Sequence, residues 1–332
     1  MDKVRVGVIG IGWFGEIHVD TYMGIPNAEV VAICTRTVKR LKSVAEKYGI
    51  KKTYTDYNEL LADDEIDAVS ICTHARDHLL PTLAAIKSGK HVLLEKPMAL
   101  TVKECDQIMD AAKDCNQYIM VGHICRFENN YAIAKREIDE GRIGDVLSIY
   151  ARRNIEGGRA LPHLNVLSSI TGDAVHDIDL MNWMIPSKAK SVYAMASNRR
   201  NLPHPDVGWV SIKYGDDAFG VSESIWNLPP TTPYDIDARM EIIGTKGVIY
   251  INESAHPLVI DDIKGRKIPD TVYWPVVHGK RTGALSTELS YFIECSLKGK
   301  KPSIITLEES REVIRVVEAA EESARTGQVV NL

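Results

Sequence analysis

The sequence predicts an α/β protein of two domains: a doubly wound parallel sheet, then an α+β domain with an open, largely antiparallel sheet. With 332 residues, the chain is too long for one ordinary hydrophobic core. Up to about residue 122, short Val- and Ile-rich runs alternate with longer amphipathic segments, as parallel strands and their covering helices do. After residue 126, strand-like runs show polar alternation, which indicates a sheet with one exposed face. We place the domains at residues 1–123 and 124–332, with the last helices available to pack back on the first domain.

The predicted strands of the first domain are short and apolar on both faces, as parallel strands covered by helices should be. They cover residues 4–9, 30–34, 68–72, 91–94 and 119–122. Helical spacing of apolar residues predicts helices over residues 38–48 and 77–88. Another helix begins at Thr101, where Glu104 three residues later completes a capping box.

The second domain begins with a predicted helix over residues 131–140 and continues as a series of strands. These strands cover residues 146–152, 191–197, 208–214, 218–225, 238–243 and 247–252. Glycine-containing turns at residues 215–217 and 244–247 predict hairpins between neighbouring strands. Two amphipathic helices close the chain, over residues 285–297 and 307–324, and Gly327 ends the second.

Composition and charge argue against several classes of protein. The formal net charge is −5 and the basic residues are scattered, so we expect neither a nucleic-acid nor a membrane partner. No apolar run approaches the roughly 18 residues of a membrane helix. The chain also enters its first strand directly, so we expect a cytoplasmic location. The six cysteines form no C-x-x-C pair and nothing completes a ligand set, so we expect no metal site.

A glycine-rich turn follows the first strand. It consists of Gly10, Ile11, Gly12, Trp13, Phe14 and Gly15. The first glycine permits the tight turn, the second lets the backbone approach a pyrophosphate, and the third lets the helix pack on the strand. The helix that begins here offers N–H groups and a positive dipole to phosphates. The motif lies between a buried strand and a helix and therefore predicts a dinucleotide site; the alternative is a tight turn without a ligand.

The end of the second strand bears on the choice between NAD and NADP. NAD-binding proteins usually carry an acidic residue there, about 20 residues after the glycines. This chain instead has Thr35 and Arg36, with Lys39 and Arg40 behind them. A guanidinium group can hold a 2′-phosphate through paired, charge-assisted hydrogen bonds, so we expect NADP rather than NAD. In the alternative interpretation, Lys39 and Arg40 only solvate a helix face, and Arg36 stacks on adenine in either cofactor.

Three blocks of sequence are specific enough to compare with known families: the glycine turn, residues 89–97 (Gly-Lys-His-Val-Leu-Leu-Glu-Lys-Pro) and residues 175–180 (Val-His-Asp-Ile-Asp-Leu). Together they resemble the glucose–fructose oxidoreductase/inositol dehydrogenase family, over essentially the whole chain. The resemblance implies an N-terminal Rossmann domain and a C-terminal open-sheet domain for substrate and oligomer contacts. It also implies hydride transfer between NAD or NADP and a hydroxyl or keto carbon of a sugar, cyclic polyol or sugar nucleotide. We therefore expect homodimers or homotetramers formed through the C-terminal sheet.

The resemblance also implies roles for individual residues. Lys96 corresponds to the lysine of the Glu-Lys-Pro motif, and His176 to the catalytic acid or base. Many members place an aspartate four residues before that histidine, where this chain has Gly172 and carries Asp173 one position later. Whether Asp173 takes the orienting role of that aspartate is left open. His74 replaces a proline found in many members, so contacts around the nicotinamide should differ.

Several polar residues follow strand ends, where a doubly wound sheet binds its ligands. Beyond the glycine turn and residues 35, 36 and 40, we expect cofactor contacts from Thr73, His74, His78, Glu95, Lys96 and His123. We expect substrate contacts from Lys96, His123, Arg153, Asn154, His163, Asp173 and His176. Residues 152–165 form an irregular polar stretch that we interpret as a lid over the substrate. The aromatic residues that could wall a sugar site or a subunit interface are Trp226, Tyr234, Tyr273 and Trp274.

Oxidation of a carbinol needs a base for the O–H proton while hydride leaves the carbon, and a histidine of near-neutral pKa is the usual choice. We assign this role to His176, with Asp173 holding the imidazole tautomer and Lys96 stabilising the developing alkoxide. The structural alternatives are a histidine hydrogen-bonded inside its helix and a lysine that reaches past the strand end to solvent. The main alternative function is a non-catalytic cofactor-binding regulator, and the presence of both Lys96 and His176 argues against it. A third hypothesis is a tightly held cofactor that shuttles hydride between two sugars.

Overall fold

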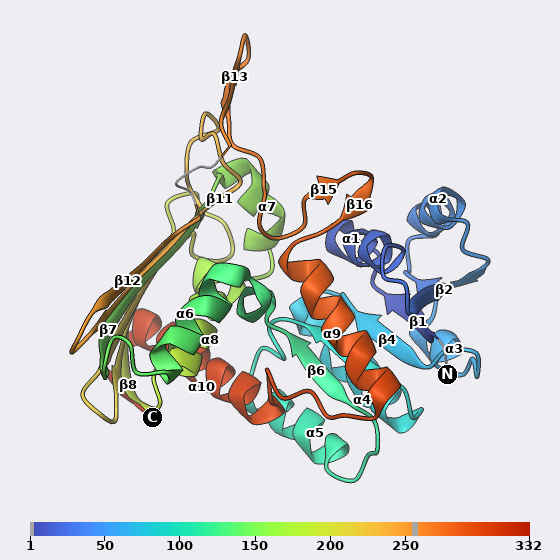
Figure 1. Cartoon of the computed structure of the whole chain (residues 1–332), viewed down its shortest axis with the longest axis horizontal. Helices are drawn as coiled ribbons and strands as arrows, with labels where there is room; N and C mark the ends of the chain where they lie inside the picture. Colours follow the sequence, from blue (N-terminus) through green and yellow to red (C-terminus); the bar gives the residue numbers. More distant parts are fainter. Residues whose placement is uncertain (1–2, 254–257) are drawn as a thin grey trace. The chain divides into compact units, whose positions relative to one another are not determined.

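The structure, a computed structural model, describes residues 3–253 and 258–332, and of residues 161–164 only the backbone. Figure 1 follows the chain from its N-terminus to its C-terminus. The chain forms two compact units. Unit 1 comprises Met1–Phe127 and Tyr273–Arg311, and unit 2 comprises Glu128–Val272 and Glu312–Leu332. A functional division between residues 123 and 124 stays a prediction. Within the described residues, no helix is long and apolar enough to span a bilayer.

Unit 1 is built on six parallel strands in the order β3-β2-β1-β4-β5-β6. Their bounds are β1 (Val4–Ile9), β2 (Ala28–Cys34), β3 (Lys52–Tyr54), β4 (Ala68–Ile71), β5 (His91–Glu95) and β6 (Ile119–Gly122). The strand order reverses direction between β1 and β4, so the carboxyl ends of these two strands mark the topological switch point where such sheets bind ligands. The predicted doubly wound parallel sheet is confirmed.

The helices of unit 1 agree with the predicted pattern and add one from the end of the chain. They are α1 (Trp13–Tyr22), α2 (Val38–Tyr48), α3 (Tyr57–Leu61), α4 (Leu79–Lys87), α5 (Val102–Ala112) and α9 (Ala284–Lys298), with 3₁₀ turns η1 (Ala75–Asp77) and η2 (Ile124–Phe127). Helix α9 packs against α1 and β1. A small hairpin of β15 (Val276–Val277) and β16 (Lys280–Arg281) precedes it. The prediction missed β3 and α3, which are too short to show a period.

Unit 2 is built on seven strands in the order β12-β11-β7-β10-β9-β8-β17. Their bounds are β7 (Val146–Ile155), β8 (Ala189–Ser197), β9 (Val207–Tyr214), β10 (Phe219–Ile225), β11 (Ile236–Gly244), β12 (Val248–Asn252) and β17 (Val330–Asn331). Only the β7–β10 pair is parallel. The predicted open, largely antiparallel sheet is confirmed.

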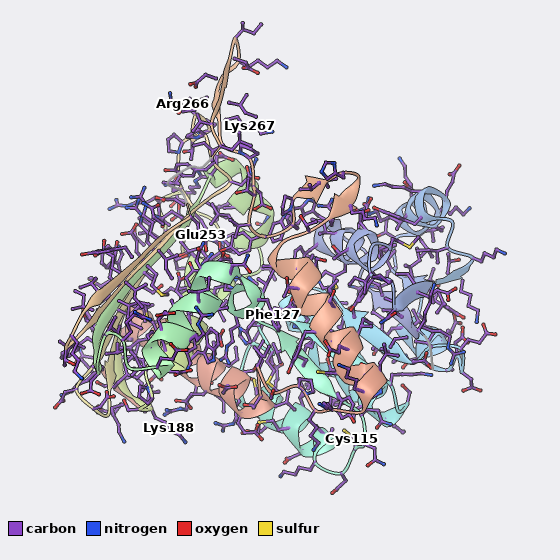
Figure 2. All side chains as sticks on the ribbon, viewed as in Figure 1. Cys115, Phe127, Lys188, Glu253, Arg266 and Lys267 are labelled. Atoms are coloured by element: carbon purple, nitrogen blue, oxygen red, sulfur yellow. The ribbon has the colours of Figure 1, made fainter. Side chains whose placement is uncertain are left out.

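Helices lie on one face of this sheet. Unit 2 contains α6 (Asn129–Asp139), α7 (Gly157–Leu164), the π-helical turn η3 (Ile170–Ala174), α8 (Val175–Met184) and most of α10 (Leu307–Thr326). Helices α6, α8 and α10 line the same face (Figure 1), and the other face carries exposed large apolar side chains on β8, β9 and β10. A hairpin of β13 (Ile260–Asp262) and β14 (Gly265–Lys267) projects from this unit and carries Arg266 and Lys267 (Figure 2). The sheet therefore has one covered face and one open face.

Strand β7 corrects a prediction that bears on the site. It continues three residues past the predicted end and pairs with β11 through Arg153↔Ala238 and Asn154↔Asp237. The interpretation of residues 152–165 as an irregular lid is therefore wrong, because the first of them are strand and residues 157–164 form α7. The pattern misled because Arg153 is a charged residue at an inward-facing strand position, where its charge is met by a carboxylate from α8.

Candidate active site

The glycine turn after β1 leaves space for a ligand at Gly12. Gly10 has a φ of +90°, and a Cβ there would lie 2.7 Å from the backbone of Cys72 and Thr73, which follow β4. A Cβ at Gly15 would overlap the carbonyl oxygen of Gly10. A Cβ at Gly12, in contrast, would meet nothing within 4 Å. The outer two glycines thus permit close packing, and the open space at Gly12, at the N-terminus of α1, fits a pyrophosphate.

Aromatic rings lie beside this turn. Trp13 packs edge-on against Trp274, with 5.8 Å between ring centroids, and Phe14 lies 5.4 Å from the same ring. Trp13 is 65% exposed, whereas Ile11 is fully buried. Of the predicted cofactor residues in the turn, Ile11 can therefore offer a ligand only its backbone. Trp274 lies next to the cofactor turn within unit 1.

The basic residues behind β2 have different surroundings. Arg36 is exposed, and its guanidinium lies 3.4 Å from Asp77. Arg40 instead donates to the carbonyl oxygens of Ile11 and Gly12, at 3.0 and 3.1 Å, and forms an ion pair with Glu16. The guanidinium of Arg40 therefore supports the glycine turn from behind, whereas the side chains of Arg36 and Lys39 are exposed.

Glu16 is shared by two cations. Lys47 donates to its carboxylate at 2.6 Å, and Arg40 forms the second ion pair. Burial by itself would raise the pKa of this carboxyl, but the hydrogen bond from Lys47 and the charge of Arg40 hold the pKa below its usual value. Glu16 therefore stays ionised and fixes the side of α1 that supports the glycine turn.

Glu95, at the end of β5, turns inward. Its Oε1 lies 3.0 Å from Nε2 of the fully buried His18, and its Oε2 accepts a hydrogen bond of 3.2 Å from the N–H of Lys96. A Cβ at Gly122 would lie 2.9 Å from Oε1, so the glycine makes room for this carboxylate. Glu95 thus holds the backbone of Lys96, and its predicted contact with the cofactor stays a prediction. The Lys96–Pro97 peptide bond is cis.

His78 ties two neighbouring strand ends together. Its Nδ1 lies 2.8 Å from the carbonyl oxygen of Pro97, and its Nε2 lies 3.1 Å from that of Thr73. Burial lowers the pKa of His78, although both carbonyl oxygens act in the opposite direction. The His78 ring therefore lies between the segments that follow β4 and β5, and a neutral imidazole donates to only one of the two carbonyl oxygens. His74 is exposed and His123, after β6, is buried.

The predicted acid–base residues of unit 2 lie in one short segment. His176 lies in the first turn of α8 and is 8% exposed. The π-helical turn η3 precedes it and contains Asp173. Asp173 Oδ2 accepts a hydrogen bond of 2.7 Å from Nε1 of Trp226, which follows β10. Asp173 and His176 lie three residues apart, where η3 leads into α8, and their joint action stays a prediction.

Arg153 and Asp177 form a buried ion pair beneath this segment. Both nitrogens Nε and Nη2 of Arg153 donate to Oδ1 of Asp177, at 3.2 and 3.0 Å, and Nη2 also donates to the hydroxyl of Tyr131 at 3.4 Å. Burial raises the pKa of Asp177 to about 6, although Arg153 opposes this. The pair anchors β7 to α8, and a contact between Arg153 and substrate stays a prediction.

Two other predicted substrate residues are Asn154 and His163. Asn154 donates to Glu223 at 2.6 Å and accepts from the N–H of Ile225 at 2.8 Å, so its amide links β7 to β10. Its predicted contact with substrate stays a prediction. His163 belongs to α7, but its side chain lies outside the described residues.

The candidate residues therefore fall into two groups. Unit 1 holds the glycine turn, Arg36 and the polar residues that follow β4, β5 and β6. Unit 2 holds Asp173 and His176, with the Arg153–Asp177 pair beside them. Among the residues that the structure describes, no cluster of three or more His, Cys, Asp or Glu side chains could hold a metal ion.

Sequence reasoning missed two residues that support the site. His18 lies one helical turn after Gly15 on α1, and that spacing is the signal that could have pointed to the inside of the unit. Trp226 was noted only as an aromatic wall, and nothing local connects it with Asp173, which is 53 residues earlier.

Two family models match the chain. Residues 4–123 match "Oxidoreductase family, NAD-binding Rossmann fold", and residues 135–332 match "Oxidoreductase family, C-terminal alpha/beta domain". The chain belongs to the Gfo/Idh/MocA oxidoreductase family. The resemblance seen in the sequence is confirmed.

Individual members of the family are similar over their whole length. Myo-inositol 2-dehydrogenase of Thermotoga maritima is 28% identical, and the match covers 99% of this chain and 98% of that protein. Scyllo-inositol 2-dehydrogenase (NAD(+)) of Bacillus subtilis is 30% identical, with 99% and 96% covered. The structure of scyllo-inositol dehydrogenase from Lactobacillus casei with NAD(H) and scyllo-inositol has a TM-score of 0.85, at 21% identity and 99% coverage of both chains. This last likeness concerns the fold.

Family membership decides between the functions considered. The protein is an NAD(P)-dependent oxidoreductase, as predicted. A non-catalytic cofactor-binding regulator on the same fold is not favoured.

Proposed function

We propose that the protein transfers hydride between a nicotinamide cofactor and a ring carbon that bears a hydroxyl or keto group in a cyclic polyol of the inositol type. The full-length relatives from Thermotoga maritima and Bacillus subtilis, both named as inositol dehydrogenases, support this substrate class. The structural observation that carries the proposal is the open space at Gly12, where α1 begins at the switch point of the sheet. Sugars and sugar nucleotides remain candidate substrates.

The residues of unit 1 fit a bound dinucleotide. The first N–H groups of α1 would hold the pyrophosphate, and Arg40 and Glu16 keep the glycine turn in place. The nicotinamide, when bound, supplies the hydride chemistry. The protein has to bind the substrate and to remove or donate the proton of its hydroxyl group.

We assign the proton to His176. In the oxidation direction, its imidazole takes the hydroxyl proton of the substrate, and Asp173 holds the imidazole in the required tautomer. Lys96, whose backbone is held by Glu95, stabilises the negative charge that develops on the substrate oxygen. Reduction uses the same groups in reverse, with His176 as the acid.

These roles are tested by two substitutions. We expect Lys96→Ala and His176→Ala each to lower kcat with myo- or scyllo-inositol by about a hundredfold or more, since general acid–base and electrostatic catalysis each contribute at least that much. Cofactor affinity, measured by fluorescence titration, should change less than about threefold, because neither residue belongs to the glycine turn. Lys87→Ala, at the exposed end of α4, is the matched control and should keep full activity.

The outcome also tests the substrate class. A kcat close to the wild-type value in either variant would refute the assigned role of the substituted residue. No turnover by the wild-type protein with any inositol, sugar or sugar nucleotide, despite cofactor binding, would refute the proposed function itself.

We infer that any preference for NADP over NAD depends on Arg36. Arg40 already binds the glycine turn and Glu16, whereas Arg36 directly follows β2 and is exposed. Lys39 is exposed as well, but it lies three residues farther along, in α2. The Bacillus subtilis relative carries NAD(+) in its name, which favours NAD. We expect Arg36→Ala to weaken NADP binding about tenfold or more and NAD binding by less than about threefold, because only NADP carries the phosphate. Calorimetric titration of both cofactors measures this, and equal losses would mean that Arg36 does not meet a 2′-phosphate.

We also propose that the protein forms homo-oligomers through the open face of the unit 2 sheet. The exposed apolar side chains on that face support the proposal. A cytoplasmic location stays a prediction.

A further inference from the structure

Gly172 lies so close to a tryptophan that any side chain there would force neighbouring groups to shift. A Cβ at Gly172 would overlap Cη2 and Cζ2 of Trp226, the far edge of the indole. Trp226 is 2% exposed and packs with Ala160, Ile155 and Leu202. Its own backbone N–H donates to the carbonyl oxygen of Asp206 at 2.7 Å. The indole is therefore held from behind and cannot yield easily to a side chain at position 172.

The same indole fixes the next residue. Nε1 of Trp226 donates to Oδ2 of Asp173 at 2.7 Å, a short bond between a donor and a carboxylate. The indole N–H has no acceptor function, so it can serve the carboxylate only as a donor. Gly172 and Asp173 both lie in η3, where a π-helical turn leads directly into the helix of His176. The indole of Trp226 thus leaves no space for a side chain at position 172 and also fixes the position of the Asp173 carboxylate.

We infer that Trp226 is a positioning residue of the active site: it holds the Asp173 carboxylate beside His176 and reserves position 172 for glycine. The inference rests on the proposed roles of His176 and Asp173. Trp226 touches neither substrate nor cofactor in this role. It acts through Asp173, by directing one carboxylate oxygen to the indole and thereby orienting the carboxylate relative to the histidine three residues later.

Two substitutions that differ in chemistry should produce the same defect. Trp226→Phe keeps an aromatic ring but removes the N–H donor. Gly172→Ala keeps the donor but places a methyl group where the indole edge lies, so the turn η3 and the indole have to separate and the hydrogen bond to Asp173 is lost. We expect each to lower kcat by about tenfold, because a hydrogen bond to a charged group is lost, while KM for the cofactor stays within about twofold. Trp183→Phe, on the same helix as His176, is the matched control and should keep normal kcat.

The double variant separates this mechanism from general damage. Phenylalanine lacks the two indole atoms that meet position 172, so adding Gly172→Ala to Trp226→Phe should cost nothing further. A loss in the double variant no greater than in either single variant supports the inference. Multiplied losses, or a Trp226→Phe variant with normal kcat, would overturn it. If Trp226→Phe fails to fold, Gly172→Ala alone carries the kinetic test against Trp183→Phe.

A readout independent of turnover distinguishes this inference from the proposed function. In the cofactor-free protein, the pKa of His176 can be measured by NMR titration of the imidazole ring. Without the indole donor, the Asp173 carboxylate keeps its full charge for the imidazolium, so we expect the pKa of His176 to rise by roughly half a unit or more in Trp226→Phe and to stay unchanged in Trp183→Phe. An unchanged pKa in Trp226→Phe would overturn the inference, even if the protein oxidises no inositol.

Discussion

Asp177 is a carboxylate whose ionisation is opposed by the fold. It is fully buried, and it forms an ion pair with Arg153, which is itself 2% exposed. Burial raises the pKa of Asp177 from 3.8 to about 6. The folded protein therefore binds a proton at this site more tightly than the unfolded chain does, which links stability to pH.

The sign of this linkage gives a prediction at the residue scale. The contribution of Asp177 to stability is fully present below about pH 4 and is lost as the pH rises toward about 6. Because one pKa unit corresponds to about 1.4 kcal/mol, the loss is up to about 3 kcal/mol. Asp177→Asn removes the titration, so the wild-type advantage over the variant in free energy of unfolding should shrink between pH 4 and pH 6.

Urea denaturation of both proteins across this range measures the difference. Groups that titrate elsewhere in the chain contribute equally to both proteins and cancel in the comparison. A difference that is flat or grows with pH would contradict the raised pKa.

Helix α5 shows how a local signal specifies an element. Thr101 accepts a hydrogen bond from the N–H of Glu104 at 3.2 Å, and the carboxylate of Glu104 accepts from the N–H of Thr101 at 3.2 Å. This is the predicted capping box, which satisfies two N–H groups that a helix start leaves without partners. The signal lies within four residues and needs no tertiary contact.

At the element scale, we expect Thr101→Ala to lower the free energy of unfolding by about 1 kcal/mol, because the cap of α5 is lost. Thr101→Ser keeps the hydroxyl and is the matched control. Hydrogen exchange locates the effect: the amide of Glu104 should lose protection in the alanine variant and keep it in the serine variant. Equal stability of the two variants would mean that the cap contributes nothing.

The open face of the unit 2 sheet carries large apolar side chains that are exposed to solvent. Met195 and Trp209 are direct cross-strand neighbours on β8 and β9, and they are 57% and 36% exposed. Phe219, on β10, is 51% exposed. Trp209 also packs against the ring of Tyr150 on β7, with 6.2 Å between centroids. Exposed apolar and aromatic side chains on one face of a sheet are typical of an interface between subunits.

At the scale of the whole molecule, we expect Met195→Glu combined with Trp209→Glu to convert a homo-oligomer to monomers, because each copy would bring buried charges to the interface. Light scattering after size-exclusion chromatography measures the mass. Leu80→Glu, which replaces an exposed leucine of α4 in unit 1, is the control and should leave the mass unchanged. A wild-type monomer, or an oligomer that survives the double substitution, would refute this interface.

Local patterns predicted much of the fold and the part of the site that depends on motifs. Strand β1 and helix α2 have the predicted bounds, because both are set by the spacing of apolar residues along a few turns or pleats. The glycine turn lies where it was predicted, at the start of α1. Lys96 follows β5 directly, so its place at a strand end was also legible from the sequence.

What the sequence by itself determined is the order of elements, the glycine turn and the family blocks, because each depends on residues that are neighbours in the chain. Only the tertiary structure decided what the charged and polar side chains meet. Arg40 donates to the glycine turn, and Glu95 pairs with His18. Arg153 pairs with Asp177, and Asp173 accepts a hydrogen bond from Trp226. These partners are distant in sequence. A polar or charged group that is buried without a partner costs free energy, so the fold has to supply these contacts. A charge in a one-dimensional pattern looks the same whether it will face solvent, a cofactor or a buried counter-charge.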